Sequence, residues 1–350
     1  MLSLNAFAGF TRTQYEGIRP MGMGNAFIAV ANDANTLWYN PAGLANISGV
    51  HFNLIDTTLG VDSMDTLNRL NRLLDGETSD LLRLDTQQAR FATKPTLITK
   101  YFGFAVSHYL NTFFDLQELT ARTIDVVATN DLTLTMGVGI PLGPLVSIGA
   151  SARLIQRTGI DALIDTQSLL NDIGLSLAEA QSSIYTNLID RYSGVGVGLG
   201  FNLGTIIKVP TSSKNPELRI AGTVEDFGGT SFRAIGSSGP PSIPMTVNLG
   251  LALTYDLAKN YTFTLAADGR DLFKNQLYTK TIHLGAEWRG PIFGLRTGIS
   301  EGYPTFGFSL ETPPHTRIHF STHAAELGSS LWERSIRFYT VQLIIGFNPF

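Results

Sequence analysis

Residues 245–255, MTVNLGLALTY, decide the fold class of this 350-residue chain. Their odd-numbered positions carry large apolar side chains, whereas the even-numbered positions carry only Thr, Asn, Gly and Ala. Because successive side chains of a β-strand point to opposite faces, this alternation predicts a strand with one apolar and one polar face. The polar face of a soluble sandwich would carry Lys and Glu, and this stretch has neither. The pattern is typical of a transmembrane β-barrel, whose apolar face contacts lipid.

The same alternation recurs along the chain from Val50 onward. It is clear at 282–288 and at 194–203, where the second face is almost entirely Gly. We expect this Gly-rich face to line the lumen and to leave room for a plug. Such segments begin near Val50, Thr96, Gly103, Asp131, Leu145, Ser193, Glu217, Met245, Tyr261, Thr279, Phe293, Thr305, Arg317 and Ser335. The sequence therefore predicts an all-β fold, a transmembrane antiparallel β-barrel of about 14 strands.

The overall composition agrees with this prediction. Charged residues make up 15% of the chain and the mean hydropathy is +0.10, whereas about a quarter of a soluble domain is charged. This composition is too apolar for a disordered chain. A bundle of transmembrane helices would need runs of about 18 apolar residues, which the sequence lacks. The net charge of −4 gives no basis for nucleic-acid binding.

The predicted connections alternate between tight and long. Tight turns are expected at 141–144, 258–260, 289–291 and 313–315, and long connections at 61–94, 159–191 and 228–242. In bacterial barrels the short turns are periplasmic and the long loops extracellular. Leu residues recur with helical spacing in two of the long loops, at 61–94 and 159–191. These loops could form an apolar groove that captures ligand, through Leu67, Leu70, Leu74, Leu169 and Ile173, or they could bury these side chains on each other or in a subunit contact.

Residues 9–48 do not alternate and precede the barrel, which we place at 49–350. Residues 1–8 end in Ala6-Phe7-Ala8, the small-x-small form of a signal-peptidase site, and are interpreted as a residual signal-peptide segment. The pair Gly22 and Gly24 lacks the further motif residues of a phosphate loop. We expect 9–48 to form a compact plug in which Asp33 or Asn35 caps a short helix. Asn40-Pro41 should end that helix.

The motifs of 9–48 resemble those of FadL/TodX-type outer-membrane transporters of hydrophobic compounds. The resemblance rests on Ala8-Gly9-Phe10, the small-residue run 22–31, Asp33-Ala34 and above all Asn40-Pro41-Ala42. It implies a barrel in the outer membrane of a Gram-negative bacterium, surrounded by outer-membrane lipids and plugged by an N-terminal hatch. Gate residues of the hatch would be Gly22, Gly24, Asn40, Pro41 and Ala42.

The resemblance also implies a mechanism, namely passive uptake of hydrophobic small molecules such as long-chain fatty acids. The ligand would be captured by the extracellular loops and released laterally into the membrane after the hatch rearranges. The C-terminal strand ends at Phe350, which resembles the signal read by barrel-assembly machinery. An alternative function is a structural or protein-partner-binding outer-membrane barrel in secretion or surface assembly, and an oligomer is compatible with either function.

Several single residues are candidates for roles inside or on the wall. Arg153 and Arg157 belong to a set of lumenal charges of both signs, which favours mutual pairing and leaves a ligand-binding role open. His108 lies on an otherwise apolar outer face and could mark an opening in the wall, or sit near the membrane interface. Gly298–Gly302 fits the pattern of a nucleophile elbow around Ser300, but in a strand-to-strand hairpin. His315, His319 and His323 would be about 13 Å apart along a strand, too far for one metal ion. We therefore expect no enzyme, no metal site and no cofactor.

Overall fold

The computed structural model describes residues 17–63, 66, 68, 87–115, 123–165, 194–210, 215–235, 239–240, 242–274, 278–312, 316–328 and 330–347. Its strands are β1 (Val50–Val61), β2 (Gln87–Thr93), β3 (Thr96–Thr99), β4 (Phe102–Asp115), β5 (Thr123–Leu142), β6 (Val146–Asp165), β7 (Gly194–Val209), β8 (Glu217–Glu225), β9 (Phe232–Ala234), β10 (Thr246–Ala258), β11 (Tyr261–Gly269), β12 (Ile282–Arg289), β13 (Phe293–Ser300), β14 (Tyr303–Thr312), β15 (Thr316–Glu326) and β16 (Ser335–Phe347). The helices are α1 (Ile18–Gly22), α2 (Thr36–Tyr39), the 3-10 helix η1 (Pro41–Asn46) and α6 (Tyr278–Thr281).

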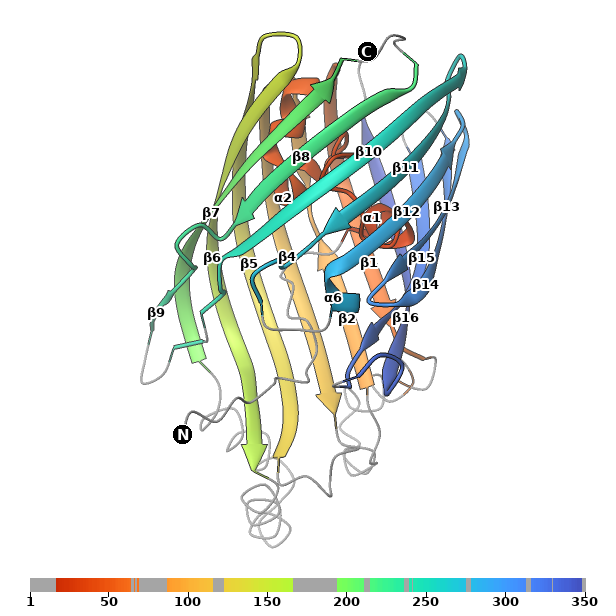
Figure 1. The fold of residues 1–350 in the computed structure, drawn as a ribbon. Helices are drawn as coiled ribbons and strands as arrows, with labels where there is room; N and C mark the ends of the chain where they lie inside the picture. Colours follow the sequence, from red (N-terminus) through yellow and green to blue (C-terminus); the bar gives the residue numbers. More distant parts are fainter. Residues whose placement is uncertain are drawn as a thin grey trace, which may run out of the picture.

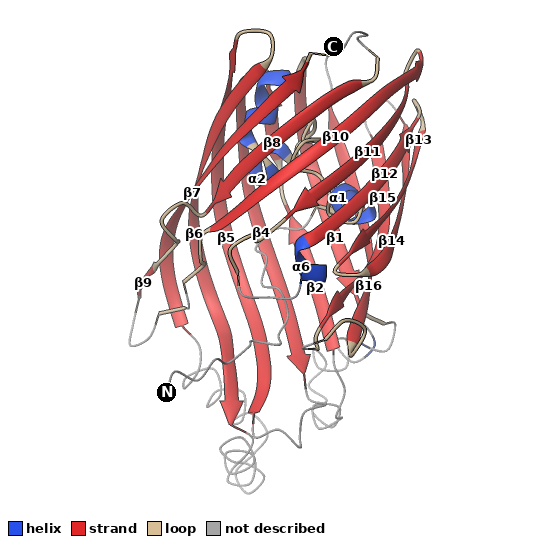
Figure 2. Cartoon of the chain, in the orientation of Figure 1, coloured by secondary structure: helices blue, strands red, loops and turns tan. Residues whose placement is uncertain are grey.

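The strands form one closed antiparallel barrel (Figure 1 and Figure 2). Closure is made by β1 and β16, which pair from Phe52↔Phe347 to Val61↔Tyr339. Strands β2 and β3 follow one another along the wall, since both pair with β1 on one side and with β4 on the other. Strand β9 similarly continues the line of β8, because both pair with β7. The barrel wall is therefore fourteen strands wide, and the predicted all-β antiparallel barrel of about 14 strands is confirmed.

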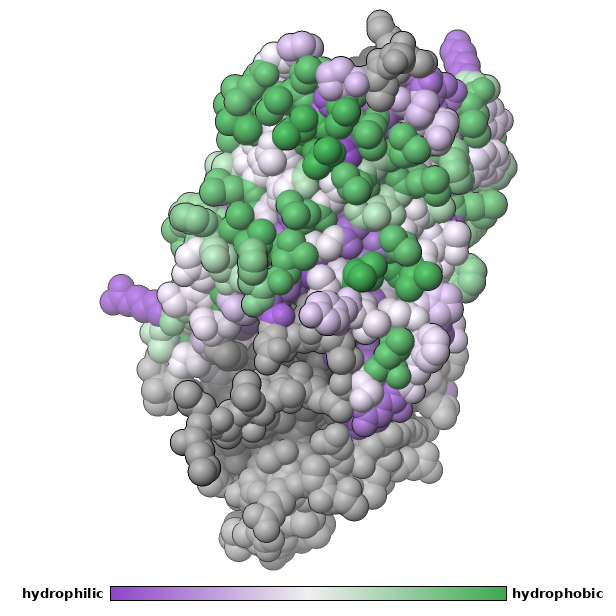
Figure 3. Space-filling view, viewed as in Figure 1, coloured by the Kyte–Doolittle hydropathy of each residue, from purple (hydrophilic) through white to green (hydrophobic). Residues whose placement is uncertain are grey.

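The alternating stretch 245–255 lies almost entirely in strand β10 and, as expected, has one outward and one inward face. On β10 the side chains of Leu249 and Leu251 are 55% and 49% exposed on the outer face, whereas Asn248 and Ala252 are 1% and 2% exposed on the inner face. Figure 3 shows how apolar side chains dominate the outside of the wall, where the strands of one half of the barrel face the viewer. No helix within the described ranges combines the length and apolarity that a membrane crossing requires.

Four of the predicted boundaries are wrong. Strand β3 begins at Thr96 as expected, but β2 precedes it at Gln87–Thr93, so these residues belong to the wall and not to the long connection at 61–94. The strand expected near Asp131 begins at Thr123, and β6 runs on to Asp165, seven residues into the predicted loop at 159–191. Near Thr279 the chain first forms α6, and β12 begins at Ile282. The ends that were missed still alternate in sequence, with Ile124, Val126 and Ala128 at every second position, but short stretches with few apolar residues do not distinguish a strand from a helix by periodicity alone.

Strand length varies around the barrel. Strands β5 and β6 have 20 residues each, whereas β12 and β13 have 8 each. The tight turns gather at one end of the barrel, and Figure 1 shows that the tall strands β5 and β6 extend furthest toward the other end. The rim at the long-connection end is therefore high over β5 and β6 and low over β12 and β13.

The N-terminal segment, residues 17–48, lies inside the barrel (Figure 1). Most of its residues are buried, and Met23, Phe27, Leu37 and Leu44 are completely inaccessible. Helix α2 starts after Asn35 and ends at Tyr39, just before Asn40-Pro41. Asp33 Oδ1 accepts hydrogen bonds from the backbone N and the side chain of Asn35, both at 2.8 Å. The helix ends before Asn40-Pro41 as predicted, but Asn35 at its N-cap makes no side-chain capping hydrogen bond, so the predicted cap is not found.

Closure at β1 and β16 gives a direct test of the topology. The chain has no Cys, so Leu59→Cys with Val341→Cys introduces a single pair at a directly opposed position. Opposed residues on neighbouring strands lie about 4.5–5.5 Å apart, which suits a disulfide. Oxidation should yield a cross-linked monomer on a denaturing gel. Leu59→Cys with Ile345→Cys lies four residues out of register and should stay uncrosslinked; equal cross-linking of both pairs would contradict the closed register.

Candidate functional site

Arg19 on α1 joins the N-terminal segment to the barrel wall. Its Nε and one terminal nitrogen donate to Glu287 of β12 at 2.8 and 2.5 Å. Its other terminal nitrogen donates to Asn32 at 2.7 Å and Asp33 at 2.8 Å. Glu287 also accepts from Arg296 Nε of β13 at 2.6 Å. Two arginines and two carboxylates thus form one buried network across the interface.

Arg19 and Asp33, the two members of this network that belong to the N-terminal segment, are both charged. Burial by itself disfavours both charged forms, but the carboxylates of Glu287 and Asp33 raise the pKa of the Arg19 guanidinium above its usual value. Burial likewise opposes ionisation of Asp33, and the Arg19 guanidinium more than offsets it, so that the pKa of this carboxyl is lowered. Charge-assisted hydrogen bonds of this kind are strong in a medium that excludes water.

Wall side chains also hold the backbone of the segment. Asp268 Oδ2 of β11 accepts from the backbone N of Phe27 at 2.6 Å and of Ile28 at 2.8 Å. Thr305 Oγ1 accepts from Gly24 N at 2.9 Å and donates to Gly22 O at 3.2 Å. A segment without a sheet partner thereby satisfies backbone groups that would otherwise be costly to bury.

Asn40 is the most contacted of the predicted gate residues. Its side-chain nitrogen donates to Ile28 O at 3.0 Å and to Thr205 O of β7 at 3.1 Å, and its Oδ1 accepts from Ala42 N at 3.1 Å. The residue is completely buried. Asn40 therefore caps η1 at Pro41, ties two parts of the segment together and anchors them to the wall.

Glycines of the wall let the segment approach closely. A Cβ on Gly298 would lie 2.5 Å from Gly24 N, and one on Gly307 would lie 2.9 Å from Gly22 Cα. Both predicted gate glycines thus face wall glycines. A Cβ on Gly149 would lie 2.3 Å from the carbonyl carbon of Pro41. Any side chain at these wall positions would displace the segment.

The Gly-rich face of β7 has a different role from the predicted one. Cβ atoms on Gly196 and Gly198 would meet Phe232, and one on Gly194 would meet Gly239 and Pro240. These glycines make room for the connection between β8 and β10, and not for the N-terminal segment. The sequence could not show this, because a bare inner face does not reveal which part of the chain covers it.

The two arginines predicted to bind ligand are held in ion pairs. Arg153 contacts Asp226 at 2.6 Å, and Arg157 forms a bidentate pair with Asp131 at 2.8 and 2.7 Å. The Arg157 guanidinium also lies 5.1 Å from the centre of the Phe232 ring. The expectation that lumenal charges pair with one another is confirmed here. Through these contacts the side chains on β5 and β6 (Asp131, Arg153 and Arg157) pack against the β8–β10 connection, which carries Asp226 and Phe232.

His108 lies beside a break in the wall. It is half-buried on the outer face of β4, and its Nε2 lies 2.6 Å from Asn130 Oδ1. Its partner in register is Thr93, the last residue of β2, and the next two residues, Lys94 and Pro95, belong to no strand. On the inner side, Lys94 Nζ lies 3.3 Å from Asp56 Oδ1. Sequence reasoning marked His108 but missed this break, although Pro95 signals it, since proline cannot donate to a strand ladder.

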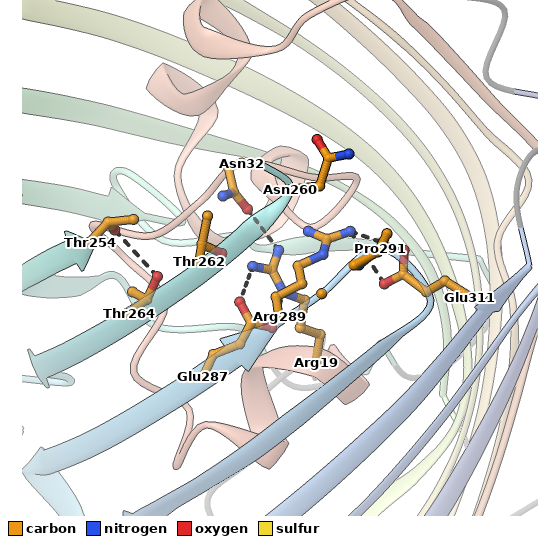
Figure 4. Close-up of a pocket in the computed structure, with 11 residues that line it drawn as sticks. Arg19, Asn32, Thr254, Asn260, Thr262, Thr264, Glu287, Arg289, Pro291 and Glu311 are labelled. Atoms are coloured by element: carbon orange, nitrogen blue, oxygen red, sulfur yellow. Dashed lines mark hydrogen bonds and ion pairs between the residues drawn. The ribbon is translucent and has the colours of Figure 1, made fainter. Parts of the chain in front are cut away.

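A polar cavity of about 330 Å³ opens beside Arg19 at the tight-turn end (Figure 4). In the figure, Arg19 reaches toward Glu287 and Asn32, and Arg289 points toward Glu311. The cavity is lined by Arg19, Asn32, Thr254, Asn260, Thr262, Thr264, Glu287, Arg289, Gly290, Pro291 and Glu311. Its lining suits water or polar groups and does not suit an apolar ligand.

The remaining predicted residues divide into two groups. Leu67, Leu70, Leu74, Leu169, Ile173 and Phe350 lie outside the described residues. Ser300 lies at the end of β13 with its Oγ 3.3 Å from His283 Nδ1, but that nitrogen also lies 2.8 Å from Gly24 O, and both side chains are at most 4% exposed. Within the described part of the chain, no group of three or more His, Cys, Asp or Glu is placed to hold a metal ion.

The buried network predicts a large effect of neutralising Glu287. Glu287→Gln leaves Arg296 without its carboxylate, and breaking a buried pair in this way costs about 3–5 kcal/mol. Unfolding by denaturant in detergent micelles, followed by Trp fluorescence, measures the loss. The matched control is Glu311→Gln, whose partner Arg289 is 33% exposed. The control should lose at most about 1 kcal/mol, and equal losses would show that the Glu287 network is not what holds the segment.

The chain is similar to known proteins in its structure, and no match is found from its sequence. No protein-family model and no curated protein sequence matches the chain. The CymD monoaromatic hydrocarbon channel is 13% identical, with 98% of each chain covered and a TM-score of 0.51. The TodX deltaS2S3 mutant monoaromatic hydrocarbon channel is 11% identical, covering 95% of this chain and 99% of its own, with a TM-score of 0.53. The TodX deltaS2 mutant is 12% identical over 96% and 99%, with a TM-score of 0.51.

These matches span nearly the whole of both chains. At such low identity they establish the fold and leave the ligand open. The resemblance to FadL/TodX-type proteins that the N-terminal motifs indicated is thereby confirmed in the structure: the chain has the fold of the TodX and CymD channels.

Proposed function

We propose that the chain is an outer-membrane channel for the passive uptake of hydrophobic small molecules. The observation that carries the proposal is the buried N-terminal segment, which occupies the lumen and is tied to the wall by Arg19, Asn40 and Asp268. A barrel blocked in this way is unsuited to free diffusion of water-soluble compounds. We propose that the segment is a hatch and that its displacement opens a path.

The charges of the hatch are arranged so that it can move. Arg19 pairs with Asp33, which belongs to the segment, and Glu287 pairs with Arg296, which belongs to the wall. Separation of the segment from the wall therefore leaves each of these two arginines paired with a carboxylate. Because an isolated buried charge costs several kcal/mol, this division lowers the free energy of displacement.

We propose that the ligand leaves sideways through the wall at Lys94-Pro95. An apolar molecule gains free energy by passing into lipid and none by entering water. The strand is already interrupted here between β2 and β3, and His108 lies on the outer face beside the interruption. Single backbone hydrogen bonds, from Lys94 N to Asp56 O and from Val106 N to Pro95 O, join this stretch to its two neighbours. Capture by the long loops through the Leu-rich stretches remains part of the proposal.

The ligand class is proposed from the same features. TodX and CymD are described as monoaromatic hydrocarbon channels, and long-chain fatty acids are the alternative that the sequence motifs suggest. Arg153 and Arg157 already have carboxylate partners, which supports an uncharged ligand over a carboxylate at these two positions. Uptake of a labelled monoaromatic compound should therefore exceed that of a labelled fatty acid.

A reversible staple tests the hatch. A Cβ on Gly103 of β4 would lie 3.2 Å from Leu37 Cγ on α2, so Leu37→Cys with Gly103→Cys places two thiols within disulfide reach. In cells producing this variant, oxidation should abolish uptake of a labelled monoaromatic compound, and a reductant should restore it. The wall staple Leu59→Cys with Val341→Cys controls for oxidation and should leave uptake unchanged.

Undiminished uptake through the stapled hatch would contradict the proposed gate. If neither labelled compound is taken up above the level of a deletion strain, transport itself is wrong. The alternative, a structural or partner-binding barrel in secretion or surface assembly, would then be favoured.

The sideways exit has its own test. Phe91↔Leu110 are opposed residues on β2 and β4, just beyond the break. Phe91→Cys with Leu110→Cys pins the two strands together there, and oxidation should slow uptake at least about ten-fold if the strands must part, a cost of about 1.4 kcal/mol in the barrier. The variant in which only Phe91→Cys is present controls for the substitution. Unchanged uptake after complete cross-linking would place the exit elsewhere.

A further inference from the structure

Three large side chains stand out at the low rim of the barrel. Tyr278 of α6 is 86% exposed, and Leu331 and Trp332 in the β15–β16 connection are 38% and 70% exposed. They surround the β13–β14 turn, because a Cβ on Gly302 would lie 2.4 Å from Leu331 Cδ1 and 3.8 Å from Thr279 Cβ. We call Tyr278, Leu331 and Trp332 the rim cluster. In Figure 1, α6 lies at the end of β12 that is remote from the tight turns.

The wall below the rim cluster is too short to cross the membrane alone. Strands β12 and β13 have 8 residues each, whereas a spanning strand needs about 9–11. Trp288 pairs with Leu295, and Gly302 follows seven residues later (302 − 295). At a rise of about 3.3 Å per residue and a tilt of about 40°, these seven residues cover roughly 17 Å. The apolar band of such barrels is about 25 Å tall, so roughly 8 Å is missing.

The opposite end of the same strands carries an aromatic group at the expected level of the first interface. Trp288 lies between Tyr261 and Phe293, with its ring centre 6.0 and 5.0 Å from theirs and the ring planes tilted by 33° and 57°. Trp and Tyr gather at membrane interfaces because one part of the ring is apolar and the other is polar. The rim cluster lies beside Gly302, at the other end of the same strands. Its large side chains extend beyond the strand ends, where the second interface should lie.

The exposed indole of Trp332 is held in place by hydrogen bonds. Its backbone N donates to Glu326 Oε2 at 2.7 Å and its Nε1 donates to Gly302 O at 3.2 Å. Glu326 is inaccessible to solvent and also accepts from the Tyr303 hydroxyl at 2.6 Å. Trp332 has φ of 62°, a backbone conformation that is unfavourable for a bulky side chain. These contacts fix the residue while 70% of it stays exposed.

We propose that the rim cluster is a lipid-contact surface that inserts at the boundary between headgroups and acyl chains of the outer leaflet. The cluster completes the apolar band over β12 and β13, so that this low side of the barrel ends at the membrane surface while β5 and β6 project beyond it. The inference rests on the proposed membrane location and is independent of which ligand is carried. Its partner is the lipid itself, because the cluster continues the exposed apolar rows of the wall, such as Ile282 at 54% and Leu284 at 43%.

The three Trp residues of the chain provide matched reporters. Trp38 is 5% exposed inside the barrel, Trp288 belongs to the tight-turn end and Trp332 to the rim cluster. Trp288→Phe leaves Trp38 and Trp332, Trp332→Phe leaves Trp38 and Trp288, and the double variant leaves Trp38 alone. Each is reconstituted into phosphatidylcholine vesicles that contain lipid brominated either near the headgroup or near the end of the acyl chain.

The proposal predicts that bromine near the headgroup quenches Trp332 as strongly as Trp288, within about two-fold, and more than bromine at the chain end. The double variant should show no quenching by either lipid. If Trp288 is quenched but Trp332 responds only to aqueous iodide, the rim cluster faces water and the proposal is overturned. If neither responds to brominated lipid although heat-modifiable gel migration shows a folded barrel, the membrane location fails as well, which distinguishes the two failures.

Discussion

The carboxylate of Glu287 is the interaction on which the architecture of the lumen depends. It accepts from Arg19 of the N-terminal segment and from Arg296 of the wall, and it is 2% exposed. Arg19 makes two charge-assisted hydrogen bonds to the carboxylate of Glu287, and this bidentate contact fixes where Arg19 lies against the wall. The position of Arg19 in turn sets the position of α1, and through it the close approach of Gly22 and Gly24 to wall glycines. Hydrogen bonds and ion pairs hold the segment against the wall. In the proposed movement, Arg19 would keep its pair with Asp33 and Glu287 its pair with Arg296.

The barrel around this segment is shaped by two different surroundings. Outward-facing rows such as Leu249 and Leu251 are apolar, whereas inward-facing residues such as Asn248 form hydrogen bonds with other wall residues and with the connections. The stepped rim adds a third requirement, because short strands at β12 and β13 leave a side of the wall that is completed by connections. The proposed exit at Lys94-Pro95, between β2 and β3, would connect the polar inside of the barrel with its apolar outside.

Much of the fold could be predicted from the sequence because alternation is a local property. Residues 245–255 and 282–288 reveal their two faces without knowledge of their neighbours. Strand ends at Gln87, Thr123 and Asp165 were missed, because the few apolar residues near them do not distinguish a strand from a helical loop by their spacing. The site shows a similar division. Asn40 was found from its motif and the lumenal charges from their faces, but the pairing of Arg19 with Glu287 spans 268 residues and leaves no trace in local sequence. The Gly face of β7 was assigned to the wrong partner for the same reason.

The most direct test of the central claim, a movable hatch, is hydrogen exchange at individual backbone amides with and without a monoaromatic ligand. The amides of Phe27 and Ile28 donate to buried Asp268 and report on the hatch, and those of β16 report on the wall. The account predicts that saturating ligand accelerates exchange at Phe27 and Ile28 and leaves β16 unchanged. Equal protection of Phe27 and Ile28 with and without ligand, in protein that takes the ligand up, would contradict it.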